Sequence, residues 1–209
     1  MKKALLIIDI QNDFISGSLA IPDGEQIVPI INSLMTAEYY DYIIASQDWH
    51  PANHKSFASN NNGTEVFAMG ELNGLPQIMW PDHCVQHTWG AEFHHDLLTE
   101  KFDYIQQKGT NPEIDSYSAF RDNNQQEITG LDIWIKEHEI SILDICGLAT
   151  DFCVKFSAID AASLLESTEV RFIQDASKAL TTEGELQATE EMQEAGVIIA
   201  NSEQILDPI

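Results

Sequence analysis

The sequence predicts an α/β fold in which a parallel sheet is covered by helices on both faces. Short apolar runs alternate along the chain with longer amphipathic segments, which is the rhythm of β-α-β units. The runs contain few polar residues, as in strands that are buried on both faces of a sheet. The chain has 209 residues, 44% of them hydrophobic, which is enough for one sizeable core. We therefore expect a single domain over residues 1–209.

Six apolar runs are expected to form the strands, namely 4–10, 42–46, 103–107, 140–146, 170–173 and 197–200. The first is rich in Leu and Ile, and the third is the weakest. Four segments have the spacing of amphipathic helices, namely 25–36, 131–138, 151–166 and 183–195. Residues 48–100 show little regular pattern and contain every histidine except His138. A long irregular segment inside a compact domain is usually functional.

The charge balance is strongly acidic. Ten Lys and Arg residues stand against 34 Asp and Glu residues, for a formal net charge of −24. Such a surface repels nucleic acid and anionic membranes, so we expect a small-molecule partner, with self-association into a homo-oligomer left open. No run approaches the length of a membrane span, the first apolar run is too short for a signal peptide, and the three cysteines are scattered. A cytoplasmic location is therefore expected.

Two charged residues stand at the ends of predicted strands. Asp9 ends the first apolar run and Lys108 ends the third. Ligands bind at the carboxyl ends of parallel strands, where burial would raise the pKa of Asp9 toward that of a useful base. Lys108 at the same edge would stabilise an anion. The alternatives are a turn-initiating aspartate and a solvated loop lysine.

Cys153 lies at the start of a predicted helix. The strand 140–146 is followed by a turn at Gly147, and Thr150 or Asp151 is the expected helix cap. Unpaired amides and the positive end of the helix dipole lower the pKa of a thiol placed there. The same amides would form an oxyanion hole. The alternative is a small buried cysteine without a chemical role.

The irregular segment carries a candidate metal site. Asp48 and His50 have the spacing that points two ligands the same way from an extended segment, and His83 completes a facial set. Zn²⁺ is the expected ion, with Fe²⁺ and Mn²⁺ as alternatives. His54 is a possible additional ligand. The other interpretation is that these histidines only order the loop, which we expect for His87, His94 and His95.

Five motifs in order resemble the nicotinamidase/pyrazinamidase family of isochorismatase-like hydrolases. They are residues 9–14 (DIQNDF), 47–51 (QDWHP), 80–86 (WPDHCVQ), 108–110 (KGT) and 147–154 (GLATDFCV). The resemblance implies a three-layer α/β/α sandwich with about six parallel strands. It also implies an Asp9–Lys108–Cys153 triad, a metal held by Asp48, His50 and His83, and a supporting role for Gln11.

The resemblance extends to the substrate pocket. It implies a pyridine ring lying among Phe14, Trp80 and Tyr117, a cis peptide before Ala149, and an oxyanion hole made by the amides of Ala149 and Cys153. The chain departs from the family at His87, where glycine is usual, and this departure bears on substrate range.

The implied activity is hydrolysis of nicotinamide to nicotinate and ammonia through a cysteine thioester, a step of NAD salvage, with pyrazinamide as a second substrate. One alternative is a sibling amidohydrolase acting on another small carboxamide or carbamoyl compound. The other is a binding module of the same fold without turnover.

Overall fold

The computed structural model describes residues 1–206 and contains one six-stranded sheet with the order β5-β2-β1-β6-β7-β8. All five pairings in it are parallel. Its strands are β1 (Lys2–Ile8), β2 (Tyr42–Asp48), β5 (Tyr104–Lys108), β6 (Ile140–Leu148), β7 (Glu169–Lys178) and β8 (Ile198–Ala200). Each predicted strand is present, so the predicted fold class is confirmed.

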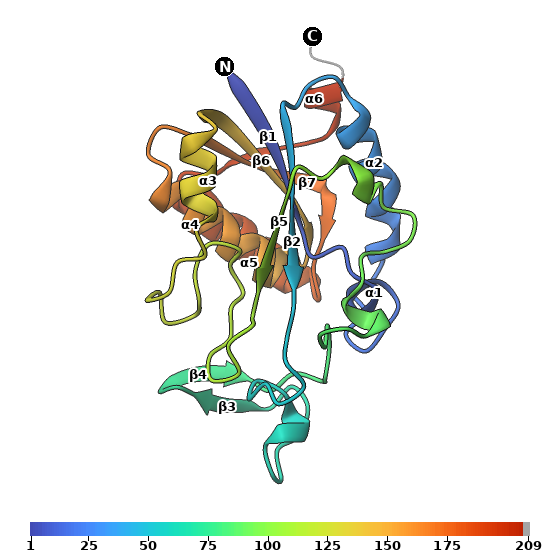
Figure 1. Cartoon of the computed structure of the whole chain (residues 1–209), viewed down its shortest axis with the longest axis vertical. Helices are drawn as coiled ribbons and strands as arrows, with labels where there is room; N and C mark the ends of the chain where they lie inside the picture. Colours follow the sequence, from blue (N-terminus) through green and yellow to red (C-terminus); the bar gives the residue numbers. More distant parts are fainter. Residues whose placement is uncertain (207–209) are drawn as a thin grey trace.

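Helices cover both faces of this sheet (Figure 1). They are α1 (Asn12–Ile15), α2 (Val28–Thr36), α3 (Leu131–Glu137), α4 (Lys155–Leu164), α5 (Thr182–Glu194) and α6 (Glu203–Leu206). Strand β1 contributes side chains to the hydrophobic cores on both faces of the sheet. Leu5 and Ile7 pack with α2, whereas Leu6 and Ile8 point the other way and pack with α3, α4 and α5. Successive side chains of a strand point to opposite faces of the sheet. Because this strand is apolar throughout, helices can pack on both faces, which gives three layers.

The order of the strands places a switch point between β1 and β6. From β1 the chain continues to β2 and β5 on one side, and it later adds β6, β7 and β8 on the other. Crevices at such points, outside the carboxyl ends of the strands, are where ligands bind in open α/β sheets. Asp9 follows β1 and Cys153 follows β6, so both flank this crevice. Asp48 and Lys108 are register partners at the ends of β2 and β5.

The segment predicted as irregular contains more structure than its pattern indicated. It forms an antiparallel hairpin of β3 (Met69–Leu72) and β4 (Leu75–Ile78), and three short 3₁₀ helices, η2 (Ala58–Asn60), η3 (Trp89–Ala91) and η4 (Thr99–Lys101). The hairpin lies beyond the carboxyl ends of β2 and β5 (Figure 1). Its turn is Asn73-Gly74, and both residues have positive φ. This dipeptide is a strong hairpin signal, and it identifies the hairpin in the sequence.

The helix that carries Cys153 does not begin as expected. Neither Thr150 nor Asp151 caps it, because the N-cap residue is Ala149. The first turn, η5 (Thr150–Val154), is π-helical, and α4 continues from it. The carboxylate of Asp151 instead accepts a hydrogen bond from the amide of Leu180, at 3.1 Å. A π turn at this point is typical of functional sites. The predicted helix 25–36 likewise begins with a 3₁₀ turn, η1 (Gly24–Ile27), ahead of α2.

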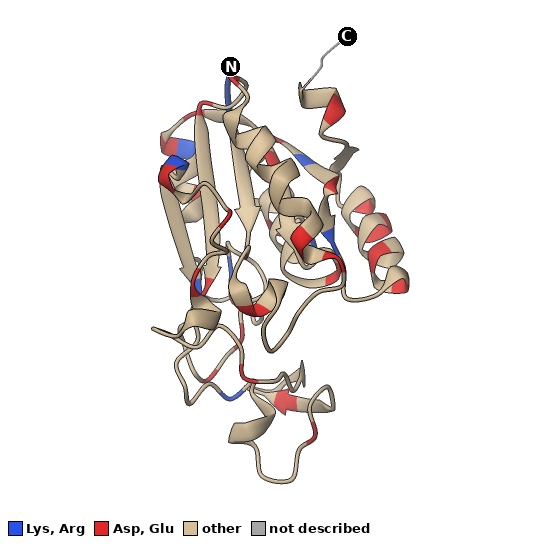
Figure 2. Ribbon diagram, turned by 90° about the vertical axis from the view of Figure 1, so that its right-hand side faces the viewer, with Lys and Arg blue, Asp and Glu red and all other residues tan. Residues whose placement is uncertain are grey.

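Acidic residues are spread along the ribbon and greatly outnumber basic ones (Figure 2). Within residues 1–206, no helix has both the length and the apolar character that crossing a membrane requires.

Candidate active site

Asp9, Lys108 and Cys153 meet at the carboxyl edge of the sheet. The ammonium Nζ of Lys108 lies 3.0 Å from Oδ2 of Asp9 and 3.5 Å from Sγ of Cys153. All three residues are buried. Three strand ends that are far apart in the sequence thus deliver a carboxylate, an ammonium and a thiol to one point, as the predicted sheet requires.

The carboxylate of Asp9 has one satisfied and one available oxygen. Oδ1 accepts a 2.6 Å hydrogen bond from Oγ of Ser46. Oδ2 faces the Lys108 ammonium, but no well-aligned hydrogen bond reaches it from residues 1–206. Burial raises the pKa of Asp9 above its ordinary value, which Lys108 counteracts. A buried carboxylate with a free oxygen and a raised pKa is suited to accept a proton.

The thiol of Cys153 contacts the same ammonium as this carboxylate. Burial raises the pKa of Cys153 well above its ordinary value, the Lys108 ammonium lowers it, and the negative charges of Asp9 and Asp48 raise it again. The thiol is therefore protonated at neutral pH and needs a base to become a nucleophile. Burial would also lower the pKa of Lys108, but Asp48 and Asp9 hold it well above its usual range, so the lysine stays charged.

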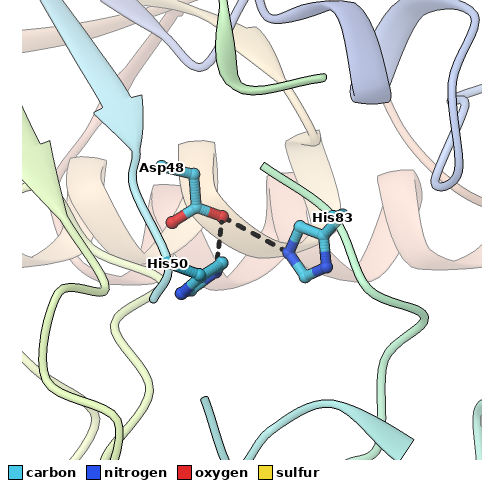
Figure 3. Close-up of side chains that lie close together, drawn as sticks. All are labelled: Asp48, His50 and His83. Carbon is cyan, nitrogen blue, oxygen red and sulfur yellow. Dashed lines mark hydrogen bonds and ion pairs between the residues drawn. The ribbon is translucent and has the colours of Figure 1, made fainter. Parts of the chain in front are cut away.

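A second cluster adjoins the first and is formed by Asp48, His50 and His83 (Figure 3). Nε2 of His50 lies 3.1 Å from Oδ2 of Asp48, and Nε2 of His83 lies 3.4 Å from the same oxygen. On the far side of each ring, Nδ1 donates to a backbone carbonyl at 2.8 Å, that of Gly109 for His50 and that of Pro81 for His83. In a neutral ring whose proton is on Nδ1, the lone pair of Nε2 therefore faces the Asp48 carboxylate, where a cation placed between them would bind both. Two imidazoles and a carboxylate, oriented in this way, are a donor set that fits a divalent transition metal.

Gln11 fixes the backbone at the end of β2, which carries Asp48. Its Nε2 donates to the carbonyls of Asp48 and Ala91 at 2.8 and 2.9 Å, and its Oε1 accepts from the amide of Asp48 at 2.8 Å. The Asp48 carboxylate also accepts from Lys108 Nζ, at 3.0 Å, so this aspartate is shared between the two clusters.

His54 and Asp115 extend the donor set. Ligand atoms of His50, His54 and Asp115 lie within 4.8 Å of one another, and all three residues are buried. Nδ1 of His54 is hydrogen-bonded to Ser56 Oγ at 2.7 Å, whereas its Nε2 has no partner within residues 1–206. Burial lowers the pKa of His54 to about 4, so the ring is neutral. Asp115 was missed from the sequence because it lies in a segment without regular pattern.

A small cavity opens onto both clusters. Its wall includes Asp48, His83, Ala149 and Cys153, and a ring of apolar side chains. These are Phe14, Leu19, Ile21, Trp80, Tyr117, Phe152 and Leu180, with Asp115 completing the lining. The three aromatic residues predicted from the resemblance are among them. Phe152 was missed, although it directly precedes the candidate nucleophile.

The turn between β6 and η5 places Ala149 and Cys153 on the same wall of this cavity. The Leu148–Ala149 peptide is cis, as the resemblance implied. His87, the departure from the family pattern, does not line the cavity. It is exposed, has a positive φ of 64°, and packs edge-on against Trp49 with ring centroids 5.3 Å apart. Of the other histidines, His94 and His95 pair with each other, with centroids 4.5 Å apart.

Two solved structures with bound ligands resemble this chain. A pyrazinamidase of Pyrococcus horikoshii in complex with zinc has 35% identity and a TM-score of 0.78, with 96% of this chain and 99% of that chain covered. The yeast nicotinamidase bound to the inhibitor nicotinaldehyde has 29% identity and a TM-score of 0.89, with 95% and 99% covered. A zinc-bound neighbour, together with the Asp48–His50–His83 cluster, points to a divalent metal in this site.

Comparison with known proteins places the chain in one family. The isochorismatase domain model matches residues 3–204. The nicotinamidase of Escherichia coli is 50% identical over 78% of this chain and 77% of its own length, and that of Acinetobacter baylyi is 44% identical over 97% and 94%. The structure of an Acinetobacter baumanii nicotinamidase and pyrazinamidase superposes with a TM-score of 0.92 at 40% identity, covering 98% of both chains. The chain therefore belongs to the isochorismatase-domain family, within its group of nicotinamidases.

Proposed function

We propose that this chain hydrolyses nicotinamide to nicotinate and ammonia, with Cys153 as the nucleophile. The observation that carries the proposal is the contact of one buried ammonium with both a carboxylate and a thiol, beside a cavity lined by aromatic rings. The identity of 44–50% to curated nicotinamidases supports the choice of substrate.

In the first half of the reaction, Asp9 takes the proton of the Cys153 thiol through its free oxygen. The sulfur attacks the carboxamide carbon, and the carbonyl oxygen becomes an oxyanion. The amides of Ala149 and Cys153 are the proposed donors to it; one such donor is typically worth about 3 kcal/mol. Asp9 then gives its proton to the amide nitrogen, the C–N bond breaks, and ammonia leaves. A thioester between the acyl group and Cys153 remains.

In the second half, water replaces ammonia beside Asp9. Asp9 removes a proton from the water, whose oxygen attacks the thioester carbon. The C–S bond breaks, the thiolate takes the proton back through Asp9, and nicotinate is released. Lys108 stays charged throughout and balances the negative charge that alternates between carboxylate and sulfur.

Asp48, His50 and His83 are the proposed ligands of a divalent metal ion, with His54 as a further donor through its unpaired Nε2. Zn²⁺ is the expected ion. When bound, it would supply a coordination position for the ring nitrogen, directly or through water, which is a role in orientation. Phe14, Trp80 and Tyr117 would then enclose the ring. Pyrazinamide keeps the same ring shape and carboxamide, so we propose it as a second substrate.

The test is release of ammonia by the purified protein from nicotinamide, from pyrazinamide and from a small carbamoyl compound. We expect turnover of the first two, loss of activity with a chelator, and recovery on addition of Zn²⁺. Turnover of the carbamoyl compound alone would contradict the proposed substrate, and no turnover of any amide would contradict the proposed reaction.

A further inference from the structure

The β3–β4 hairpin turns one polar side chain inward. Gln77 on β4 pairs with Gly70 on β3 and is 3% exposed, whereas Met69, which pairs with Ile78 in the same hairpin, is 68% exposed. Burial of an amide is costly unless its hydrogen-bonding groups are paired, so the inward position of Gln77 needs a physical reason.

The reason lies in the acceptors around Nε2 of Gln77. This nitrogen is 2.9 Å from Oδ2 of Asp115, 3.1 Å from the hydroxyl oxygen of Tyr117 and 2.9 Å from the carbonyl of Ile78. The Tyr117 hydroxyl also accepts from Nε1 of Trp80, at 3.3 Å. One side-chain amide thus joins a carboxylate and a phenol that are two residues apart in another segment.

Asp115 and Tyr117 need such a connection because their segment has little structure of its own. Residues 111–130 contain no helix or strand, and the nearest elements are β5 and α3. Both residues line the catalytic cavity, whereas Gln77 does not. The other oxygen of Asp115 is occupied by the amide of Ser116, at 2.8 Å. Without Gln77, a buried carboxylate oxygen would lose its side-chain donor, which costs more than a neutral unpaired group.

We propose that Gln77 is a positioning residue for the substrate cavity. Its amide fixes the Asp115 carboxylate and the Tyr117 ring, and through them the wall that faces the pyridine ring of the substrate. This inference rests on the proposed function, because it concerns how the amide substrate is held. The triad residues lie at the ends of β1 and β5 and in η5, and the Asp115–Tyr117 segment reaches them through the Ser116 carbonyl, which accepts from Lys108 Nζ at 3.1 Å. We expect the effect of Gln77 to fall on binding, because its amide bonds to the cavity-lining side chains of Asp115 and Tyr117 rather than to that carbonyl.

The test compares Gln77→Met with Gln106→Met. Methionine keeps the length of glutamine and removes the donor. Gln106 is a matched control because it is also buried and lies outside the cavity wall. Within residues 1–206 its Nε2 donates to the carbonyl of Gln107 alone, and its Oε1 accepts from the Tyr104 hydroxyl at 3.2 Å. We expect Q77M to raise KM for nicotinamide about ten-fold and to change kcat by less than about three-fold, the pattern of lost ground-state binding. Q106M should leave both values within about two-fold of the parent.

A double-mutant cycle with Tyr117→Phe identifies the route. If Gln77 acts through the Tyr117 hydroxyl, the rise in KM caused by Q77M is smaller in the Y117F background than in the parent. Gln77→Glu, which keeps the shape of the side chain but has no N–H donor, serves as a second variant and should also raise KM.

Several results would overturn the proposal. One is an unchanged KM in Q77M and Q77E, or an equal rise of KM in Q106M. Another is a loss of kcat in Q77M with no change in KM. Failure of both Gln77 variants to fold would also overturn it, because the residue would then support only the hairpin. A parent enzyme without activity on nicotinamide would instead contradict the proposed function.

Discussion

Two buried carboxylates in this protein, Asp9 and Asp144, are both paired with cations, and the quality of the pairing separates them. On β6, the carboxylate of Asp144 accepts hydrogen bonds from Nε and Nη2 of Arg171, at 2.6 and 2.7 Å. It also accepts one from the hydroxyl of Tyr40, at 2.6 Å. Both of its oxygens are satisfied. At the edge of the sheet, Asp9 accepts one aligned hydrogen bond from Ser46 and shares a single ammonium with three other groups, the Asp48 carboxylate, the Ser116 carbonyl and the Cys153 sulfur.

The difference shows what distinguishes a structural ion pair from a reactive one in the same sheet. The fork of arginine matches the two oxygens of Asp144, and this geometry holds a charge in place. The point charge of Lys108 cannot satisfy a carboxylate completely, which leaves one oxygen of Asp9 without an aligned donor, next to the ammonium that also contacts the Cys153 thiol. Spare acceptor capacity at an accessible position is what proton transfer requires.

The largest expected effect separates two buried cysteines. Cys153→Ala should lower kcat by about 10⁴-fold or more, because no other thiol lies beside the Lys108 ammonium. Cys146→Ala, a matched change on β6 beside Asp144, should keep activity within about three-fold. Ammonia release gives the activities, and thermal unfolding shows whether each variant is folded. Near-parental activity in C153A would remove Cys153 from the reaction.

The two carboxylates should respond in opposite ways to the same substitution. Asp9→Asn keeps the shape and removes the base, so kcat should fall by about 10³-fold with a small change in Tm. Asp144→Asn leaves Arg171 without its counterion and should cost about 3 kcal/mol of stability, or about 10 °C in Tm, with kcat nearly unchanged in the folded protein. The comparison fails if D144N loses activity as severely as D9N at a temperature where both are folded.

Removal of a metal ligand should have an intermediate effect. His83→Ala should lower the metal content measured by elemental analysis and raise KM by at least about ten-fold, because the proposed role of the ion is orientation. His54→Ala should lower metal affinity less, since the other three donors remain. Full metal occupancy in H83A would show that the ion, if present, is held elsewhere.

The smallest effect concerns the hydrogen bond from Ser46. Activity requires ionised Asp9 and is therefore lost as pH falls through the pKa of this residue. Burial raises that pKa above 3.8, and the Ser46 hydroxyl lowers it. Ser46→Ala should thus move the acid limb of the profile of kcat/KM against pH to higher pH, by less than about one pH unit. A shift to lower pH would contradict the assignment of this limb to Asp9.

The sequence predicts the sheet and the triad for one physical reason. Buried parallel strands are continuous apolar runs, so the polar residue that ends each run can be recognised in the sequence. Asp9 and Lys108 are such residues. Cys153 is visible because a turn and a helix follow the strand. These positions depend on strand order, which places β1 beside β6, and the periodicity by itself does not determine that order.

Asp115, Phe152 and Gln77 could not be predicted in the same way. Asp115 lies in a segment whose conformation is set by contacts with distant side chains, such as the amide of Gln77. The hairpin that carries Gln77 has four-residue strands with Pro76 in one of them, too short and too irregular for an alternating pattern. Its Asn73-Gly74 turn was the one available signal. The π turn at Cys153 has no sequence signature, because it depends on how the chain leaves β6.

The central claim is that the sulfur of Cys153 becomes acylated, and intact-protein mass spectrometry tests it most directly. Protein mixed with nicotinamide and quenched in acid within the first turnovers should carry one added nicotinoyl group, located on Cys153 by peptide mapping and absent from the C153A variant. An adduct on another residue, or turnover by the parent protein with no adduct on Cys153 in samples quenched during the first turnovers, would contradict the account.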